Sequence, residues 1–276
     1  MTDSSATWSN RARWILRFVF AVRCFGLGER YLWNEFEADS SIFSTLLFEW
    51  NYPEALAQRV DDVGMQLMVA AGVIVLLTGF FNHRFARWLS SIALVVAIVW
   101  ELLLPLTKMI RGGELLASWS LAEHALRLAI PIVLLILHFS DRLQPTEWVL
   151  RIAVAATFGI HGIKAWLAAP TFVTMIISTC QNLFEFWPEQ SGVELVLKVI
   201  CVADLLVAML VIARRWPRVA FYATVWGLIT AAARYTSSSL GWPESLLRAA
   251  HIGGPYVLYL QWRRDLAEEQ DLDCLD

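Results

Sequence analysis

Three pairs of ionisable residues stand three positions apart within otherwise apolar stretches of the chain. Each pair joins a histidine to a fixed cation, and the pairs are His124 with Arg127, His161 with Lys164, and Arg248 with His251. In a helix this spacing places both side chains on one face, so an imidazole lies beside a permanent positive charge. Such a face can bind an anion or hydrogen-bond the carbonyl oxygens of a quinone, and the imidazole can relay a proton near neutral pH.

Other charged side chains also interrupt apolar segments, at Arg30, Glu101, Asp204 and Arg234. A charge at the centre of a membrane helix costs at least about 2.5 kcal/mol, so such residues are candidate functional groups. We predict an outward-facing cationic pocket in which three residues contact the ligand or relay protons, namely His161, His251 and Lys164. Its further ligand-binding residues are predicted to be Arg30, Glu101, His124, Arg127, Asp204, Arg234 and Arg248. The alternative is that these groups pair with one another and only fix helix packing.

The composition indicates which elements must position these residues. Of the 276 residues 58% are hydrophobic and 17% are charged, and the mean hydropathy is +0.54. An average soluble domain has roughly 25% charged residues. These figures exclude a large soluble domain, a disulfide scaffold and a nucleic-acid-binding protein. We expect an all-α polytopic membrane protein that contacts the lipid bilayer through eight helices, at about 14–32, 64–81, 85–105, 121–139, 148–168, 193–213, 217–235 and 245–262.

Basic residues orient these spans, because lysine and arginine remain on the cytoplasmic side. Alternate connecting segments hold ten basic residues, whereas the others hold only Arg59, Lys108 and Arg111. Both termini are therefore predicted to be cytoplasmic, in a bacterial inner membrane, with no cleaved signal peptide. The long segments 33–63 and 169–192 then lie outside, where their aromatic residues predict lids or interfacial helices, or simple interface anchors.

The two halves of the chain resemble each other. Trp14-x-Leu16-Arg17 matches Trp148-x-Leu150-Arg151 at an offset of 134 residues, and each half closes with a helix that carries a histidine, an arginine and a proline. An even number of spans per half inserts both halves in the same sense. We therefore predict two parallel four-helix repeats, 13–143 and 144–264. A cytoplasmic segment 1–12 precedes them, and an acidic cytoplasmic tail, 265–276, follows.

Residues 150–152, Leu-Arg-Ile, and 158–164, Phe-Gly-x-His-Gly-x-Lys, resemble the opening helix of DoxX-like membrane proteins. The first half resembles it less closely, through residues 16–18 and 26–30. The resemblance implies four-helix units that serve quinone-linked redox systems of sulfur or oxidative-stress metabolism. It also implies a quinone as cofactor, and a redox partner protein or larger membrane complex. The chain departs from the family pattern because it fuses two units.

Other functions remain open from the sequence, including whether the chain is an enzyme at all. A parallel-repeat transporter for small molecules or anions would use the same cationic pocket, and a structural subunit of a membrane complex would need no chemistry. A b-type haem carrier is less favoured. His124 and His138 have a suitable separation on one helix, but no second helix carries such a pair. No metal site is predicted, because the chain has no C-x-x-C or H-E-x-x-H motif.

Overall fold

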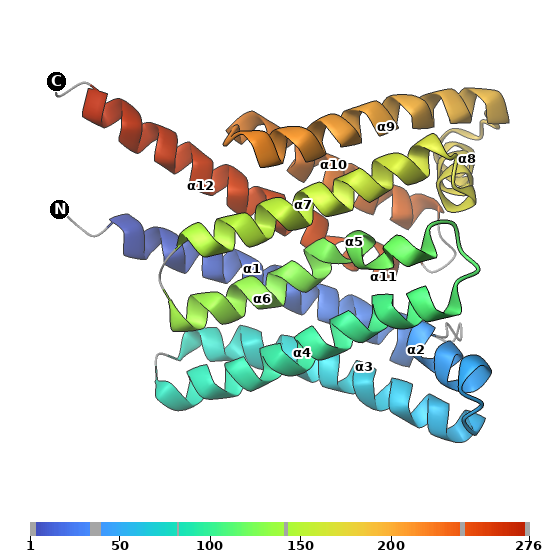
Figure 1. The fold of residues 1–276 in the computed structure, drawn as a ribbon, viewed down its shortest axis with the longest axis horizontal. Helices are drawn as coiled ribbons and strands as arrows, with labels where there is room; N and C mark the ends of the chain where they lie inside the picture. The colour runs from blue at the N-terminus through green and yellow to red at the C-terminus, as the bar shows by residue number, and fades with distance from the viewer. Residues whose placement is uncertain (1–3, 34–39, 82, 141–142, 238–240, 274–276) are drawn as a thin grey trace.

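The computed structural model describes residues 4–33, 40–81, 83–140, 143–237 and 241–273, and over these ranges helices are the only regular secondary structure. Figure 1 shows long helices that run side by side along the longest axis of the molecule. The first turns of α1 and the last turns of α12 lie at one end of this bundle, and α2 and α8 lie at the other. Residues 34–39 of the predicted outer segment 33–63 lie outside the described ranges.

The long helices are α1 (Ser4–Gly28), α3 (Glu54–Leu77), α4 (Arg84–Arg111), α6 (Ala125–Phe139), α7 (Leu143–Trp166), α9 (Gln190–Ala213), α10 (Pro217–Ser237) and α12 (Ala249–Asp273). Shorter helices connect them, and these are α2 (Ser41–Ser44), α5 (Ser120–Glu123), α8 (Pro170–Phe184) and α11 (Trp242–Leu246). Single turns complete the chain at η1 (Glu29–Trp33), η2 (Thr45–Glu49), η3 (Thr78–Phe80) and η4 (Ala117–Trp119). The predicted all-α class is confirmed for the described residues.

Five helical segments of the described chain are long and apolar enough to cross a membrane. They are Glu54–Phe80, Arg84–Arg111, Ala117–Phe139, Gln144–Trp166 and Gln190–Ala213. Each overlaps one of the spans predicted from the sequence, from the second to the sixth. The remaining three predicted spans fall on α1, α10 and α12, which are not among these five segments. The chain is therefore a helical protein with several segments suited to a lipid bilayer.

Several of the long helices, among them α3 and α12, extend beyond the predicted spans. Helix α3 begins at Glu54, directly after Pro53, and not at 64. Its first turns are polar, so hydropathy does not reveal them. Helix α12 continues through the acidic tail to Asp273. Within this extension Arg264 Nε lies 3.5 Å from Glu268 Oε1, one helical turn later. These two helices therefore continue beyond their apolar segments, α3 at the end of the bundle that holds α2 and α12 at the opposite end (Figure 1).

The halves interlock through their first and last helices. Within the first half α1 packs on α3 and α4 on α6, and within the second α7 packs on α9 and α10 on α12. Across the halves α6 packs on α7, and α12 packs on α1. The core between them is filled by fully buried side chains such as Phe20, Leu134, Leu150 and Trp262. Each half therefore covers a face that the other would leave exposed.

The closing helix of each half is broken, although a continuous helix was predicted at 121–139 and at 245–262. In the first half the break falls at His124, between α5 and α6. The hydroxyl of Thr157 on α7 accepts from the Leu126 N–H at 3.3 Å and donates to the Ala122 carbonyl at 3.4 Å. A side chain inserted into the hydrogen-bond ladder in this way bends a helix. In the second half the break falls at residues 247–248, between α11 and α12.

Helices α10 and α12 come into close contact at Gly227, where a Cβ atom would clash with the carbonyl group of His251. Replacing Gly227 with Ala should therefore push the backbones apart and lower the free energy of unfolding by about 1–3 kcal/mol. Thermal unfolding in detergent measures this change. The matched control is Gly159→Ala on α7, where a Cβ meets no atom within 4 Å. That control should raise stability by roughly 0.4–1 kcal/mol, and a similar loss in both variants would contradict the close-approach explanation.

Candidate functional site

A cavity of about 190 Å³ lies among five helices of the second half, α7, α8, α9, α10 and α12. Most of its wall is apolar and includes Phe158, Phe172, Ile200 and Trp226. Helix α8, which runs across the ends of its neighbours in Figure 1, contributes Phe172 to this wall. The combination of an apolar wall with a few convergent polar groups is typical of a small-molecule site.

The polar part of the wall consists of His161, Asp204, Arg234, Arg248 and His251. The rings of His161 and His251 stack, with centroids 5.8 Å apart and planes 10° from parallel. Arg248 Nη1 lies 3.3 Å from His251 Nε2. A guanidinium can only donate, so His251 Nε2 accepts and the ring proton lies on Nδ1. The predicted pairing of Arg248 with His251 on one helix face is confirmed.

Three buried polar atoms of this wall have no hydrogen-bond partner among the described residues. They are His161 Nε2, His251 Nδ1 and Asp204 Oδ1. A buried polar atom without a partner costs about 1–3 kcal/mol, so a bound molecule that satisfies these atoms gains that energy. The cavity thus offers two imidazole nitrogens and one carboxylate oxygen to a ligand.

Three arginines, Arg127, Arg234 and Arg248, lie in or beside the cavity. The charges that act on Arg248 come from Arg234, Arg127 and Glu123, in decreasing order. None of these three arginines forms an ion pair within the part of the chain that the structure describes. Glu123 is the acidic side chain that acts on all three of them. The region around the cavity therefore holds more arginines than acidic side chains.

Two of the predicted ligand contacts form ion pairs away from the cavity. Lys164 Nζ lies 2.7 Å from Glu123 Oε2, where Lys108 also lies at 3.5 Å. Arg30 pairs with Glu244 on the short helix α11. Neither Lys164 nor Arg30 lines the cavity, so in the structure these cations tie helices together.

Glu101 and His124 also lie outside the cavity wall. Glu101 on α4 pairs with Arg23 on α1, and their side chains are 0% and 2% exposed. His124 Nδ1 lies 2.9 Å from the carbonyl oxygen of Ser120, one turn earlier. Arg127 contributes charge without lining the cavity. The structure thus brings five of the predicted residues to one cavity and uses the others around it.

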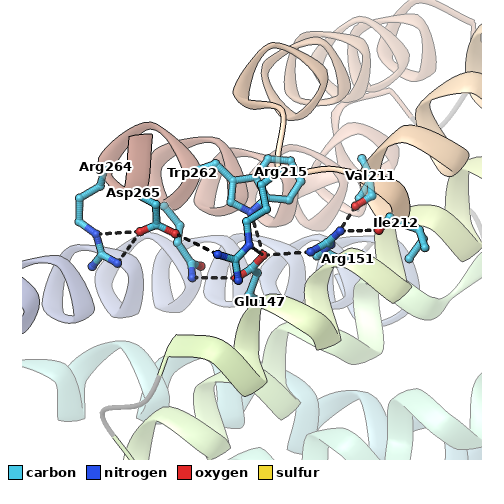
Figure 2. A network of polar contacts seen from close by, with 9 residues as sticks. Glu147, Arg151, Val211, Ile212, Arg215, Trp262, Arg264 and Asp265 are labelled. Atoms are coloured by element: carbon cyan, nitrogen blue, oxygen red, sulfur yellow. Dashed lines mark hydrogen bonds and ion pairs between the residues drawn. The ribbon is translucent and has the colours of Figure 1, made fainter. Parts of the chain in front are cut away.

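Sequence reasoning missed two acidic residues that organise the cations. Glu123 stands four residues before Arg127, and Glu147 stands four residues before Arg151, a spacing that could have revealed both. Figure 2 shows Glu147, which is 1% exposed, at the centre of a polar network. Its Oε1 accepts from Arg215 Nε at 2.8 Å and Trp262 Nε1 at 3.0 Å, and lies 3.3 Å from Arg151 Nη1.

Arg151 also caps the end of a neighbouring helix. Its Nε donates to the Val211 carbonyl at 2.8 Å, and its Nη2 donates to the Ile212 carbonyl. These carbonyls belong to the last turn of α9, whose acceptors have no partner within the helix. Glu147 and Arg151 therefore join α7, α9 and α12 at the end of the bundle opposite α8 (Figures 1 and 2).

Among the residues that the structure describes, no group of three or more His, Cys, Asp or Glu side chains lies close enough together to hold a metal ion. Comparison with family models, with curated proteins and with solved structures gives no match. What the chain binds is therefore inferred from the cavity, its orphaned polar atoms and its surplus of positive charge.

Proposed function

We propose that the chain is an eight-helix, DoxX-like membrane protein built from two parallel four-helix repeats, with both termini in the cytoplasm. The Trp-x-Leu-Arg motifs support the duplication, because each arginine lies over the ring of its own tryptophan. Arg17 lies 5.9 Å from the Trp14 centroid, and Arg151 lies 4.2 Å from the Trp148 centroid. Each of these arginines also reaches the end of the next long helix, Arg151 at Ile212 and Arg17 at Gly79.

The broken helices and the charge pattern support the same architecture. His124 and Arg248, which stand at the two breaks, each precede a proline of the same helix by seven residues. Parallel repeats place such breaks at equivalent points. The first turns of α1 and the last turns of α12 share one end of the bundle (Figure 1), as an even number of spans requires. Basic residues in alternate connections assign that end to the cytoplasm, in a bacterial inner membrane.

The cavity in the second repeat binds the head group of a lipid-soluble quinone. About 190 Å³ corresponds to roughly six water molecules, which is room for one substituted ring. The His251 Nδ1 proton and the guanidinium of Arg248 can donate hydrogen bonds to carbonyl oxygens, while the apolar wall holds the ring. His161 and Asp204 can exchange protons at the head group. Reduction would also need electrons, which a redox partner protein would supply.

The observation that carries this proposal is the placement of the orphaned atoms. His161 Nε2, His251 Nδ1 and Asp204 Oδ1 all belong to residues that line one otherwise apolar cavity. Residues that served only for packing would have satisfied these atoms with one another or with the backbone. The break between α11 and α12 lies beside them, and irregular backbone at membrane depth is typical of binding sites.

The surplus of positive charge favours a second candidate function. Arg127, Arg234 and Arg248 lie close enough to act on one another and share Glu123 as their acidic neighbour. A small organic acid with an apolar body would satisfy both this charge and the apolar wall. In that case the parallel repeats would belong to a transporter, and the cavity would be its substrate site.

Titration of the purified protein with ubiquinone-1 tests the first proposal. We expect saturable binding by calorimetry, and replacing His161 with Ala should raise the Kd by roughly tenfold or more, because a buried hydrogen bond is lost. His124→Gln is the matched control, since His124 is a histidine of the same cationic region that does not line the cavity. Binding of benzoate but not of ubiquinone-1 would favour the transporter. Equal losses in both variants would contradict the placement of the site.

A further inference from the structure

A second cavity, of about 660 Å³, lies in the first half of the chain at the opposite end of the bundle from α8. Four basic side chains line it, namely Arg13, Arg17, Arg87 and His138. They come from the middle of α1, the beginning of α4 and the end of α6. The described residues of its wall include no acidic side chain.

The three arginines of this cavity all act on the imidazole of His138. Arg17 Nη2 lies 3.1 Å from His138 Nε2, and the charged groups that act on His138 are Arg17, Arg13 and Arg87. Arg17 is only 9% exposed, and its Nε has no hydrogen-bond partner within the described residues. Gly79 lies against Arg17 Nη1, and its missing side chain leaves room for the guanidinium. A buried cation in such a position is stable only when an anion or several acceptors satisfy it.

The proposed duplication indicates what kind of group would satisfy Arg17. At the offset of the Trp-x-Leu-Arg motifs, Arg17 corresponds to Arg151 and Arg13 corresponds to Glu147. At the offset of the two helix prolines, His138 corresponds to Trp262. In the second repeat Arg151 and Trp262 converge on the carboxylate of Glu147 (Figure 2). The first repeat keeps the arginine and has His138 in place of the tryptophan, but it has Arg13 where the carboxylate would stand.

We propose that the cavity lined by Arg17, Arg87 and His138 binds a phosphate group, which neutralises Arg17 as Glu147 neutralises its counterpart Arg151. A tetrahedral oxyanion accepts several charge-assisted hydrogen bonds at once, and guanidinium groups match it in a bidentate manner. The volume holds a phosphate together with the atoms esterified to it. The phosphate belongs either to a phospholipid head group at the membrane surface or to free inorganic phosphate. The comparison of Arg17 with Arg151 rests on the proposed duplication, whereas the grouping of arginines around His138 does not.

Thermal unfolding of the full chain in detergent, without quinone, tests this proposal. The probes are inorganic phosphate and dioctanoyl-phosphatidylglycerol, each compared with chloride at equal ionic strength. A ligand that binds only the folded state raises the unfolding midpoint in a concentration-dependent way. We expect Arg17→Gln and Arg87→Gln to raise the apparent Kd by roughly tenfold or more, as loss of a charge-assisted hydrogen bond predicts.

The second repeat provides the matched control, Arg218→Gln, because Arg218 corresponds to Arg87 in the short basic turn but does not line this cavity. Phosphate salts also stabilise proteins without binding, and this effect should be the same in all variants. Arg87 is exposed, so its replacement tests the site even if Arg17→Gln fails to fold. A shift with the lipid alone identifies a head group, and a shift with phosphate alone identifies the free anion. No shift beyond chloride, or equal shifts in Arg87→Gln and Arg218→Gln, would overturn the proposal.

Discussion

Replacing Glu101 with Gln should lower the free energy of unfolding by about 3–5 kcal/mol, because it leaves Arg23 as an uncompensated buried charge. Arg23 Nη2 donates to Glu101 Oε2 at 2.7 Å, between helices α1 and α4, where both side chains are almost completely buried. The other charge that acts strongly on Arg23 is Arg127, which is also positive. Unfolding in detergent by increasing SDS or temperature measures the loss.

The double variant Arg23→Met/Glu101→Met separates the pair from its surroundings. Removing both charges abolishes the cost of desolvating them. The free energy of unfolding of this variant should therefore equal or exceed that of the wild-type protein. A single Glu101→Gln variant within about 1 kcal/mol of the wild type, the range of an exposed ion pair, would show that Arg23 has another way to be neutralised.

Replacing Glu147 with Gln should have an effect of similar size at the other end of the bundle, again about 3–5 kcal/mol. The variant loses the carboxylate on which Arg151, Arg215 and Trp262 converge (Figure 2), while Arg151 stays buried. Helices α7, α9 and α12 should then separate at this end before the rest of the bundle unfolds. Hydrogen exchange of the last turns of α9, together with the unfolding midpoint, reports this change.

The matched control removes one donor of the same network. Arg215 is 47% exposed, so Arg215→Gln should cost less than about 1 kcal/mol, as exposed ion pairs do. If Glu147→Gln were no more harmful than Arg215→Gln, the network of Figure 2 would be a surface feature and would not hold the helices together.

The positions of the long helices could be predicted because apolar side chains must face lipid or the core over enough residues to cross a bilayer. Their polar extensions could not, since the first turns of α3 at 54–63 look like a loop by hydropathy. The break at His124 was equally hidden. It depends on the hydroxyl of Thr157, which stands 31 residues from the amide of Leu126 that it contacts.

The site was predictable as a group of residues but not as a cavity wall. His161 and Lys164 stand three positions apart on α7, yet one lines the cavity and the other reaches Glu123. The direction of a long flexible side chain depends on which acidic residue a neighbouring helix presents. Asp204 joined the site because α7 and α9 approach closely at Gly162, where a Cβ atom would lie 3.3 Å from the Asp204 side chain.

The contact between α1 and α12 has a consequence for biosynthesis. At Gly253 the two helices are so close that a Cβ atom would contact Val19 of α1. A ribosome adds about 5–20 residues per second, so on the order of ten seconds or more separate the synthesis of these two helices. During that interval the flank of α1 that α12 covers has no partner within the chain. Chains truncated before α12 should therefore be degraded faster than the full chain, even though the other long helices are present.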